Sequence, residues 1–335
     1  MAINKFKRFL YGKTVVITGA SSGIGRAAAM AFAQNGANLV LAARREDVLA
    51  TVAAECATFG VKAIAVKTDV TDAEAMKRLA ETAADFGGKI DIWINNAGIG
   101  SVGEFTQTPV TAHQRVIETN LLGYVHGAHA VLPYFKRQLF GVLINTNSLG
   151  GWIAQPYSVA YAASKFGLRG FSEALRGELI KFPRIHICDI FPGFIDTPGF
   201  QHGANYVGRP IKPIPPVYDA RRVAKAMVSL GVRPKDAVIV GASAAFMKLL
   251  NTLFPRVTQK VLVTLMNFYF KRAKPVPVSD GSLFHTDDTD TGIDGGWRSQ
   301  HTVRNVAIAS ATVAAGIAAG YYLMRRKGRR NKPVY

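Results

Sequence analysis

A glycine-rich turn near the start of the chain is the feature that most constrains its fold. The apolar run at residues 14–18 leads directly into Gly19, and Gly23 and Gly25 follow as a helical stretch opens. In a strand-turn-helix unit, the first glycine permits the tight turn, the second lets the backbone approach a pyrophosphate, and the third lets the helix pack closely. The start of the helix also offers free N–H groups and a positive dipole to phosphate. The turn therefore predicts a nucleotide-binding α/β fold.

Short apolar segments alternate with helical stretches over the first 241 residues. The expected strands are residues 14–18, 38–43, 62–69, 90–98, 141–148, 184–193 and 236–241. The helical stretches between them are long enough to cross over a sheet, and continuous apolar strands are typical of a parallel sheet covered on both faces. We therefore predict an α/β fold with a doubly wound, parallel, seven-stranded sheet of the Rossmann type, in which ligands bind at the carboxyl ends of the strands.

A second pattern, in the middle of the chain, indicates proton-transfer chemistry. Tyr161 and Lys165 are four residues apart in the run YAASK, and Ser148 precedes them. Positions i and i+4 share a helix face, so the lysine ammonium is expected to favour the tyrosine phenolate and to lower its pKa. Such a tyrosine exchanges a proton with an alcohol or carbonyl oxygen, which the serine hydroxyl would hold. Alone, this spacing is typical of a solvated helix face, but the phosphate turn upstream favours a catalytic role.

Further motifs follow in a consistent order: Asn95-Asn96-Ala97-Gly98 at the end of the fourth strand, Asn120, and Pro192–Thr197 from the end of the sixth. Together with the glycine turn, Ser148 and the YxxxK pair, this set resembles the short-chain dehydrogenase/reductase family over residues 12–240. The resemblance implies a dinucleotide-dependent oxidoreductase that interconverts an alcohol and a carbonyl.

The resemblance also implies roles for individual residues. The catalytic residues would be Asn120, which anchors a water in a proton relay, Ser148, Tyr161 and Lys165. Lys165 would also hold the nicotinamide ribose, and Asp69 would read the adenine amino group. The cofactor-binding set would comprise Gly19, Ser21, Ser22, Gly23, Ile24, Gly25, Arg44, Asp69, Val70, Asn96, Ala97, Gly98, Tyr161, Lys165, Pro192, Gly193, Ile195 and Thr197.

The end of the second strand bears on the choice of cofactor. An acidic residue at this position would bind a ribose 2′-hydroxyl, whereas an arginine accommodates a 2′-phosphate. The chain has Arg44 and Arg45 here, with no carboxylate before Glu46, which favours NADP(H). The alternative is that both arginines are solvated surface charges, and Ser22, where some NADP-preferring relatives carry a basic residue, weakens the case.

The C-terminal third has a different pattern. We expect a catalytic domain over residues 1–241, an amphipathic helical extension over 242–272, a flexible linker over 273–304, a transmembrane helix over 305–324 and a basic tail over 325–335. The uncharged 20-residue run at 305–324 is about long enough to cross a bilayer. It could also lie flat at the membrane surface, or be a helix packed on the domain or a partner. We expect a membrane-associated protein with a cytoplasmic catalytic domain and membrane lipid as a partner.

The remaining expectations concern function and assembly. We predict an NADP(H)-dependent oxidoreductase acting on an apolar alcohol or ketone; the alternatives are a catalytically silent, membrane-tethered nucleotide-binding scaffold, or dehydration or epimerisation on the same fold. We expect no metal site at His126 and His129, and no nucleic-acid partner, because no such binding motif accompanies the basic termini. The apolar surplus of the helix near residues 158–181, namely Phe166, Leu168, Phe171, Leu175 and Leu179, predicts a homodimer or homotetramer.

Overall fold

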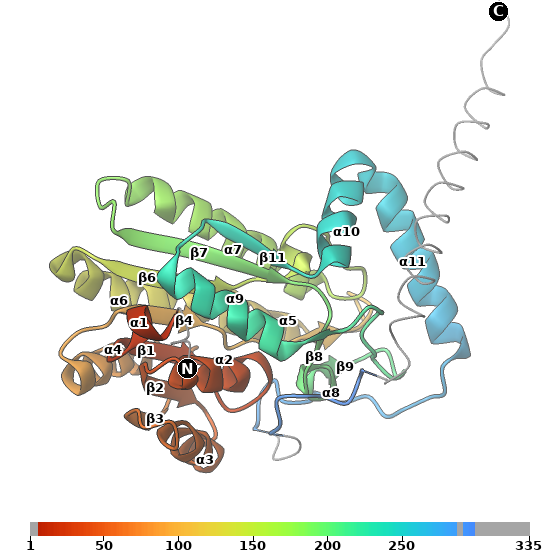
Figure 1. The fold of residues 1–335 in the computed structure, drawn as a ribbon. Helices are drawn as coiled ribbons and strands as arrows, with labels where there is room; N and C mark the ends of the chain where they lie inside the picture. The colour runs from red at the N-terminus through yellow and green to blue at the C-terminus, as the bar shows by residue number, and fades with distance from the viewer. Residues whose placement is uncertain (1–5, 287–290, 299–335) are drawn as a thin grey trace, which may run out of the picture.

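The computed structural model describes residues 6–286 and 291–298 (Figure 1). Its centre is a parallel sheet of seven strands in the order β11-β7-β6-β4-β1-β2-β3. These strands are β1 (Thr14–Thr18), β2 (Asn38–Ala43), β3 (Ala63–Lys67), β4 (Ile92–Asn95), β6 (Gly141–Thr146), β7 (Ile185–Pro192) and β11 (Ala237–Val240). The predicted seven-stranded doubly wound sheet is confirmed. The strand order reverses between β1 and β4, and ligands of such sheets bind beside that point.

Helices cover both faces of the sheet (Figure 1). One face carries α1 (Lys7–Leu10), α2 (Gly23–Gln34), α3 (Glu46–Ala57) and α9 (Ala220–Val232), and the other carries α4 (Ala73–Gly87), α6 (Gly123–Gln138) and α7 (Val159–Glu178). A helix α5 (Val110–Ile117) and a π-helical turn η1 (Glu118–Leu122) lead into α6. The shorter elements are β5 (Ser101–Val102), η2 (Leu149–Gly151), β8 (Ile195–Asp196), α8 (Gly199–His202), β9 (Ala204–Asn205) and β10 (Tyr218–Asp219).

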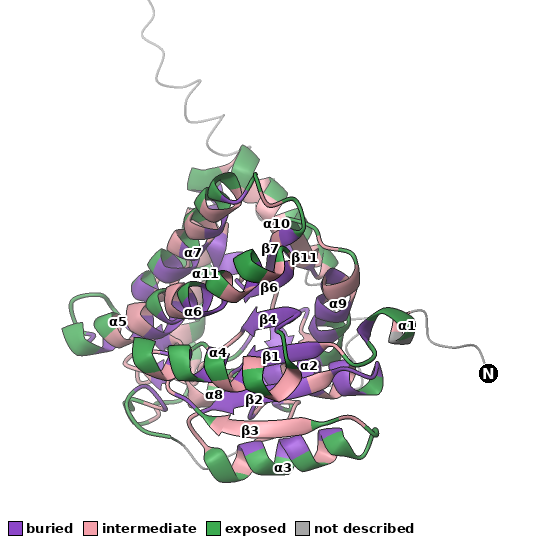
Figure 2. Cartoon of the chain, turned by 90° about the vertical axis from the view of Figure 1, so that its left-hand side faces the viewer, coloured by how far each residue is buried: buried purple, intermediate pink, exposed green. Residues whose placement is uncertain are grey.

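The strands divide their side chains between two apolar clusters, one on each face. In β1, Val15 and Ile17 join the cluster under α2 and α9, whereas Val16 joins the cluster under α4 and α6. Successive strand residues point to opposite faces, so a strand that is apolar at every position must be covered on both. Figure 2 shows the inner strands such as β1 and β4 as buried, the edge strand β3 as partly buried, and the outer sides of the flanking helices as exposed.

The apolar surplus on α7 is used inside the subunit, which corrects the packing argument for an oligomer. Leu168 and Leu179 are buried in the subunit, and Phe171 and Leu175 pack against the cluster shared by α4 and α6. Among the five residues proposed for an interface, Phe166 is the most exposed, at 39%. The homodimer or homotetramer therefore rests on the family resemblance.

After the sheet, α10 (Ala242–Leu253) and α11 (Pro255–Arg272) form a helical pair. Pro255 starts α11, where a proline costs no hydrogen bond. The pair packs on the loop after η2, because Asn251 donates to the Trp152 carbonyl at 3.1 Å and Gln259 donates to the Ala154 carbonyl at 2.8 Å.

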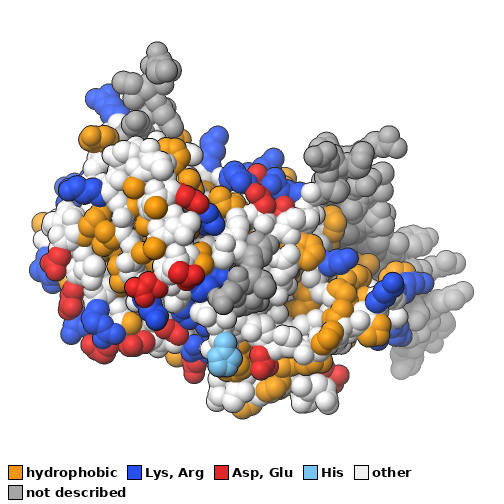
Figure 3. All heavy atoms as spheres, turned by 90° about the horizontal axis from the view of Figure 1, so that it is seen from below, with side chains coloured by type: hydrophobic (Ala, Val, Ile, Leu, Met, Phe, Trp, Pro, Cys, Tyr) orange, Lys and Arg blue, Asp and Glu red, His pale blue; other side chains and the backbone are white. Residues whose placement is uncertain are grey.

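The chain that follows α11 returns along the edge of the domain and passes beneath α8 towards α2 (Figure 1). We call residues 276–286 and 291–298 the C-terminal strap. The sequence places them in a flexible linker, whereas the structure gives them specific contacts: Ser279 forms an antiparallel bridge with Asn205, and Arg298 pairs with Asp196. Seen from below, where the strap runs, basic and acidic side chains are interspersed (Figure 3).

The structure also bears on the predicted membrane association. Within residues 6–286 and 291–298, no helix combines the length and the apolar character needed to cross a bilayer. The predicted transmembrane helix at residues 305–324 and the basic tail lie outside the described residues. The expected membrane-associated localisation and the membrane lipid partner therefore have no support in the described part of the chain, which corrects both expectations.

Candidate functional site

The glycine turn joins β1 to α2 at the carboxyl edge of the sheet. Gly19 has φ +64°, a left-handed conformation that favours glycine, and a Cβ there would lie 2.7 Å from the Ala97 Cα. A Cβ at Gly25 would lie 2.1 Å from the Gly19 carbonyl oxygen, so any side chain would push α2 away from the turn. Both positions therefore require glycine, which keeps the start of α2 directly behind the turn.

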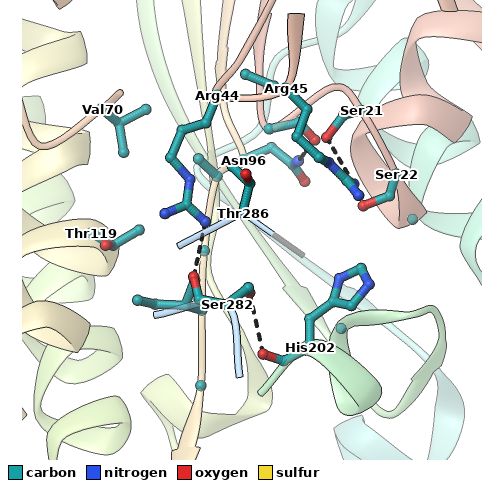
Figure 4. Close-up of a pocket in the computed structure, with 18 of the residues that line it drawn as sticks. Ser21, Ser22, Arg44, Arg45, Val70, Asn96, Thr119, His202, Ser282 and Thr286 are labelled. Carbon is teal, nitrogen blue, oxygen red and sulfur yellow. Dashed lines mark hydrogen bonds between the residues drawn. The ribbon is translucent and has the colours of Figure 1, made fainter. Parts of the chain in front are cut away.

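A cavity of about 230 Å³ lies in front of this turn (Figure 4). Of the predicted cofactor-binding residues, it is lined by Gly19, Ser21, Ser22, Gly23, Ile24, Arg44, Asp69, Val70, Asn96, Ala97, Gly98 and Thr197. The lining also contains Arg45, Arg115, Thr119, His202, Ser282 and Thr286. Gly25 does not line it and acts through packing. The strap residues Ser282 and Thr286 carried no recognisable motif.

Charged side chains gather at one end of the cavity. Arg44 and Arg45 extend from the end of β2, and their guanidinium groups enter the cavity opposite Ser282 and His202 (Figure 4). Burial lowers the pKa of Arg44, opposed by the negative charge of Asp69 and assisted by the positive charge of Arg115. An arginine remains charged even so, and a buried guanidinium is a strong partner for an anion.

Asp69 and Arg115 form a pair beside these arginines. Arg115, on α5, donates from Nη2 to the Asp69 Oδ2 at 3.1 Å and from Nη1 to the Thr71 hydroxyl at 2.9 Å. Burial by itself would raise the pKa of Asp69, but hydrogen bonds from the Thr71 amide and hydroxyl, together with the charge of Arg115, lower it on balance. Asp69 is therefore an ionised acceptor. Sequence reasoning missed Arg115, which has no signature beyond its place on a helix.

A second cavity, of about 290 Å³, opens beside the first. Ser148, Tyr161 and Lys165 line it, and so do the predicted residues Pro192, Gly193, Ile195 and Thr197. The two cavities share residues of the turn after β4 and of the segment after β8, including Asn96, Gly98 and Thr197. The structure thus brings the phosphate turn and the tyrosine-lysine pair to one continuous site.

The lysine is deeply buried behind the tyrosine. Its Nζ donates to the Thr146 carbonyl at 2.9 Å and lies 5.9 Å from the centre of the Tyr161 ring and 4.9 Å from that of Tyr124. Burial lowers the pKa of Lys165 to about 7, opposed by the negative charge of Asp189. Lys165 therefore changes charge near neutral pH.

The electrostatics of Tyr161 differ from the expectation. Burial raises the pKa of Tyr161, and its hydrogen bond with Ser148 opposes this rise. The expected lowering by Lys165 is wrong for this structure, because the same burial that surrounds the phenol also disfavours the lysine's charge. Ser148 is held in turn, since its Oγ accepts from the Gly150 amide at 3.0 Å.

Asn120 lies in the π-helical turn η1 and lines neither cavity. Its side chain is fully buried and makes two hydrogen bonds to the backbone of Ile99. Oδ1 accepts from the Ile99 amide at 2.9 Å, and Nδ2 donates to the Ile99 carbonyl at 2.8 Å. Ile99 lines both cavities, so Asn120 fixes the backbone where they meet.

These features define a class: an α/β protein with a phosphate turn and a tyrosine-lysine-serine group at the carboxyl edge of its parallel sheet. Comparison with known proteins narrows the class. The family model described as short chain dehydrogenase matches residues 13–205. The uncharacterized oxidoreductase YxnA of Bacillus subtilis (strain 168) is 35% identical over 320 residues, which cover 92% of this chain and 90% of the relative. The chain belongs to the short-chain dehydrogenase/reductase family and is an oxidoreductase of that family.

Two solved structures are also similar to this chain in fold and sequence. An alcohol dehydrogenase from the archaeon Thermococcus sibiricus, complexed with 5-hydroxy-NADP, superposes with a TM-score of 0.60 and 29% identity, over 68% of this chain and 95% of that one. A metagenomic short-chain oxidoreductase in complex with NADP has a TM-score of 0.60 and 26% identity, over 69% of this chain and 97% of that one.

Proposed function

We propose that this chain is an NADP(H)-dependent oxidoreductase that interconverts an alcohol and a carbonyl on an apolar small molecule. One observation carries the proposal. The cavity that contains Ser148, Tyr161 and Lys165 adjoins the cavity of the glycine turn, so that a molecule in each would meet near Asn96 and Thr197.

The residues around the first cavity fit a phosphorylated dinucleotide. The turn between β1 and α2 has no room for side chains at Gly19 and Gly25, as a close backbone approach to a pyrophosphate requires. Arg44 and Arg45 place two guanidinium groups where a 2′-phosphate would need partners, and both structural neighbours were solved with NADP or a derivative of it. When bound, NADP(H) supplies or accepts the hydride.

The residues of the second cavity handle the proton. We assign the Tyr161 hydroxyl the exchange of a proton with the substrate oxygen. Because the Ser148 Oγ already accepts from the Gly150 amide, its own proton is available to that oxygen or to the tyrosine. Lys165, with a pKa of about 7, contributes positive charge behind the tyrosine when it is protonated and relays a proton when it is not. We assign Asn120 the positioning of Ile99 and, by family resemblance, a relay water.

The walls of the second cavity favour an apolar substrate. Its apolar lining residues include Val102, Leu149, Phe194, Phe200 and Ile211, and polar residues such as Gln155 and Ser158 also line it. Such a surface binds apolar groups by excluding water and leaves Ser148 and Tyr161 to fix the reacting oxygen.

The test is NADPH oxidation by the full chain against a panel of apolar ketones and aldehydes. Tyr161→Phe should lower kcat by a factor of about 10² to 10⁴, the usual worth of a positioned acid or base, while NADPH affinity stays within about twofold. An unchanged kcat would remove Tyr161 from the mechanism. NADPH binding without turnover of any carbonyl would instead support a catalytically silent nucleotide-binding protein.

A further inference from the structure

The C-terminal strap lies outside the segment matched by the family model, yet it forms part of the cofactor cavity. Ser282 and Thr286 line the cavity, whereas the match to the family model ends at residue 205. The alignment with the Bacillus subtilis relative covers 92% of this chain and therefore includes the strap.

The first half of the strap is firmly attached to the domain. The Ser279 amide donates to the Asn205 carbonyl at 3.0 Å, and the Asn205 amide donates to the Ser279 carbonyl at 2.8 Å. Leu283 is 1% exposed and packs with Ala112 and Val116 of α5. Because this side chain is locked in a small apolar cluster, the carbonyl groups on either side of it are fixed in direction.

Two of these carbonyls hold the arginines of the cavity. The Arg44 Nη2 donates to the Ser282 carbonyl at 2.9 Å, as Figure 4 shows, and the Arg115 Nε donates to the Leu283 carbonyl at 3.1 Å. A guanidinium has five N–H donors in a rigid plane, so a bond to a carbonyl restrains its direction and, at Arg44, leaves other donors for a ligand. Because Arg115 forms an ion pair with Asp69, the position of the Asp69 carboxylate is restrained as well.

The second half of the strap reaches the glycine turn itself. The Gly23 amide donates to the Gly292 carbonyl at 2.9 Å, and the Arg26 Nη1 donates to the Thr291 carbonyl at 2.8 Å. Arg298 then anchors this half through Asp196 at 2.9 Å and Asp219 at 2.8 Å. The strap therefore contacts the cavity at both the arginine end and the phosphate-turn end.

We propose that the C-terminal strap is a positioning element of the cofactor site, which orients Arg44 and Arg115 through the Ser282 and Leu283 carbonyls and so favours a dinucleotide with a 2′-phosphate. The proposal rests on the proposed use of NADP(H). The restraint acts on the guanidinium that would meet the 2′-phosphate. Loosening the strap therefore weakens NADPH far more than NADH, and it leaves the chemistry at Tyr161 unchanged.

The test uses Leu283→Ala in the full chain, because this side chain anchors the strap without lining the cavity. Titrations with NADPH and with NADH, followed by cofactor fluorescence, should show an NADPH Kd raised about tenfold, the loss expected for one charge-assisted hydrogen bond. The NADH Kd should change by less than about twofold, and kcat at saturating NADPH should be retained. Leu283→Met should behave as the native chain, and so should Leu265→Ala, which removes an exposed side chain from α11.

An equal loss of affinity for both cofactors, or no loss for either, would overturn the proposal. A second measurement covers a variant that folds poorly: in the native chain, NADPH should slow amide hydrogen exchange over residues 279–286 more than saturating NADH does, and equal protection would also refute it. Failure of the proposed function looks different, because the native chain would then bind neither cofactor, bind both equally, or reduce no carbonyl.

Discussion

Replacing Lys165 by methionine should make the protein more stable at pH 6 while abolishing its activity. Lys165 is 3% exposed, and burial lowers its pKa from 10.5 to about 7. That difference corresponds to about 5 kcal/mol, at roughly 1.4 kcal/mol per pKa unit, by which folding disfavours the ammonium. Methionine keeps the length of the side chain and removes the charge.

The stability gained by removing the buried charge is partly offset by the loss of a hydrogen bond that Lys165 makes. Its Nζ donates to the Thr146 carbonyl at 2.9 Å, and a hydrogen bond from a charged group is worth about 1.5–3 kcal/mol. We therefore expect Lys165→Met to raise the free energy of unfolding by about 2–3.5 kcal/mol at pH 6, the balance of these two contributions.

The sign of the pH dependence follows from proton binding. Between pH 7 and pH 10.5 the unfolded chain holds a proton on Lys165 that the folded chain has lost, so native stability rises with pH across this window. The advantage of the methionine variant is largest below pH 7 and disappears towards pH 10.5, where only the lost hydrogen bond remains. The variant should then be the less stable of the two.

Urea unfolding at pH 6, 8 and 10, without cofactor, measures this difference, and comparing two chains cancels the titration of all other groups. Lys77→Met, at an exposed position on α4, is the matched control and should show little change at any pH. If Lys165→Met destabilised the protein equally at all three pH values, Lys165 would not be desolvated and the reasoning would fail.

Three further predictions address the cofactor, the turn and assembly. Arg44→Asp should raise the NADPH Kd about a hundredfold and the NADH Kd by no more than about threefold, since a phosphate partner becomes a repulsive carboxylate; equal changes would contradict the NADP(H) assignment. Gly25→Ala should lower the melting temperature sharply, because its Cβ would lie 2.1 Å from the Gly19 carbonyl oxygen. The control Gly177→Ala, at a position with open space around it, should be neutral or slightly stabilising. Similar effects of the two substitutions would refute the packing argument. Light scattering at micromolar concentration should show a homodimer or homotetramer, and a fully active monomer would contradict it.

The sheet could be predicted from the sequence because each of its strands carries its own signal. Residues 15–17 and 39–43 are apolar at every position, which is typical of a strand covered on both faces. The glycine turn could also be predicted from the sequence, since its backbone conformation requires glycine at specific positions. The tyrosine-lysine pair was recognisable for its spacing on one helix face.

The contacts of the strap could not be predicted from the sequence, because most of them are made by its backbone. The Ser282, Leu283 and Gly292 carbonyls make their contacts whatever side chains those residues carry. Proline, glycine and aspartate in this segment are typical of a linker, and no periodicity distinguishes a docked segment from a free one. The predicted lowering of the Tyr161 pKa was wrong for a related reason: spacing identifies the neighbours of a residue but does not measure how deeply they are buried.

The far end of the strap also links the two cavities. Trp297 donates its ring N–H to the Thr197 carbonyl at 3.1 Å and meets Phe200 edge-on, with ring centres 6.2 Å apart. Thr197 lines both cavities and Phe200 lines the second, so the strap that binds Arg44 at one end supports the wall of the second cavity at the other. A region beyond the family model thus touches both halves of the site. In the proposed function, the glycine turn and the tyrosine-lysine-serine group supply the chemistry, and in our further proposal the strap sets the preference for the cofactor.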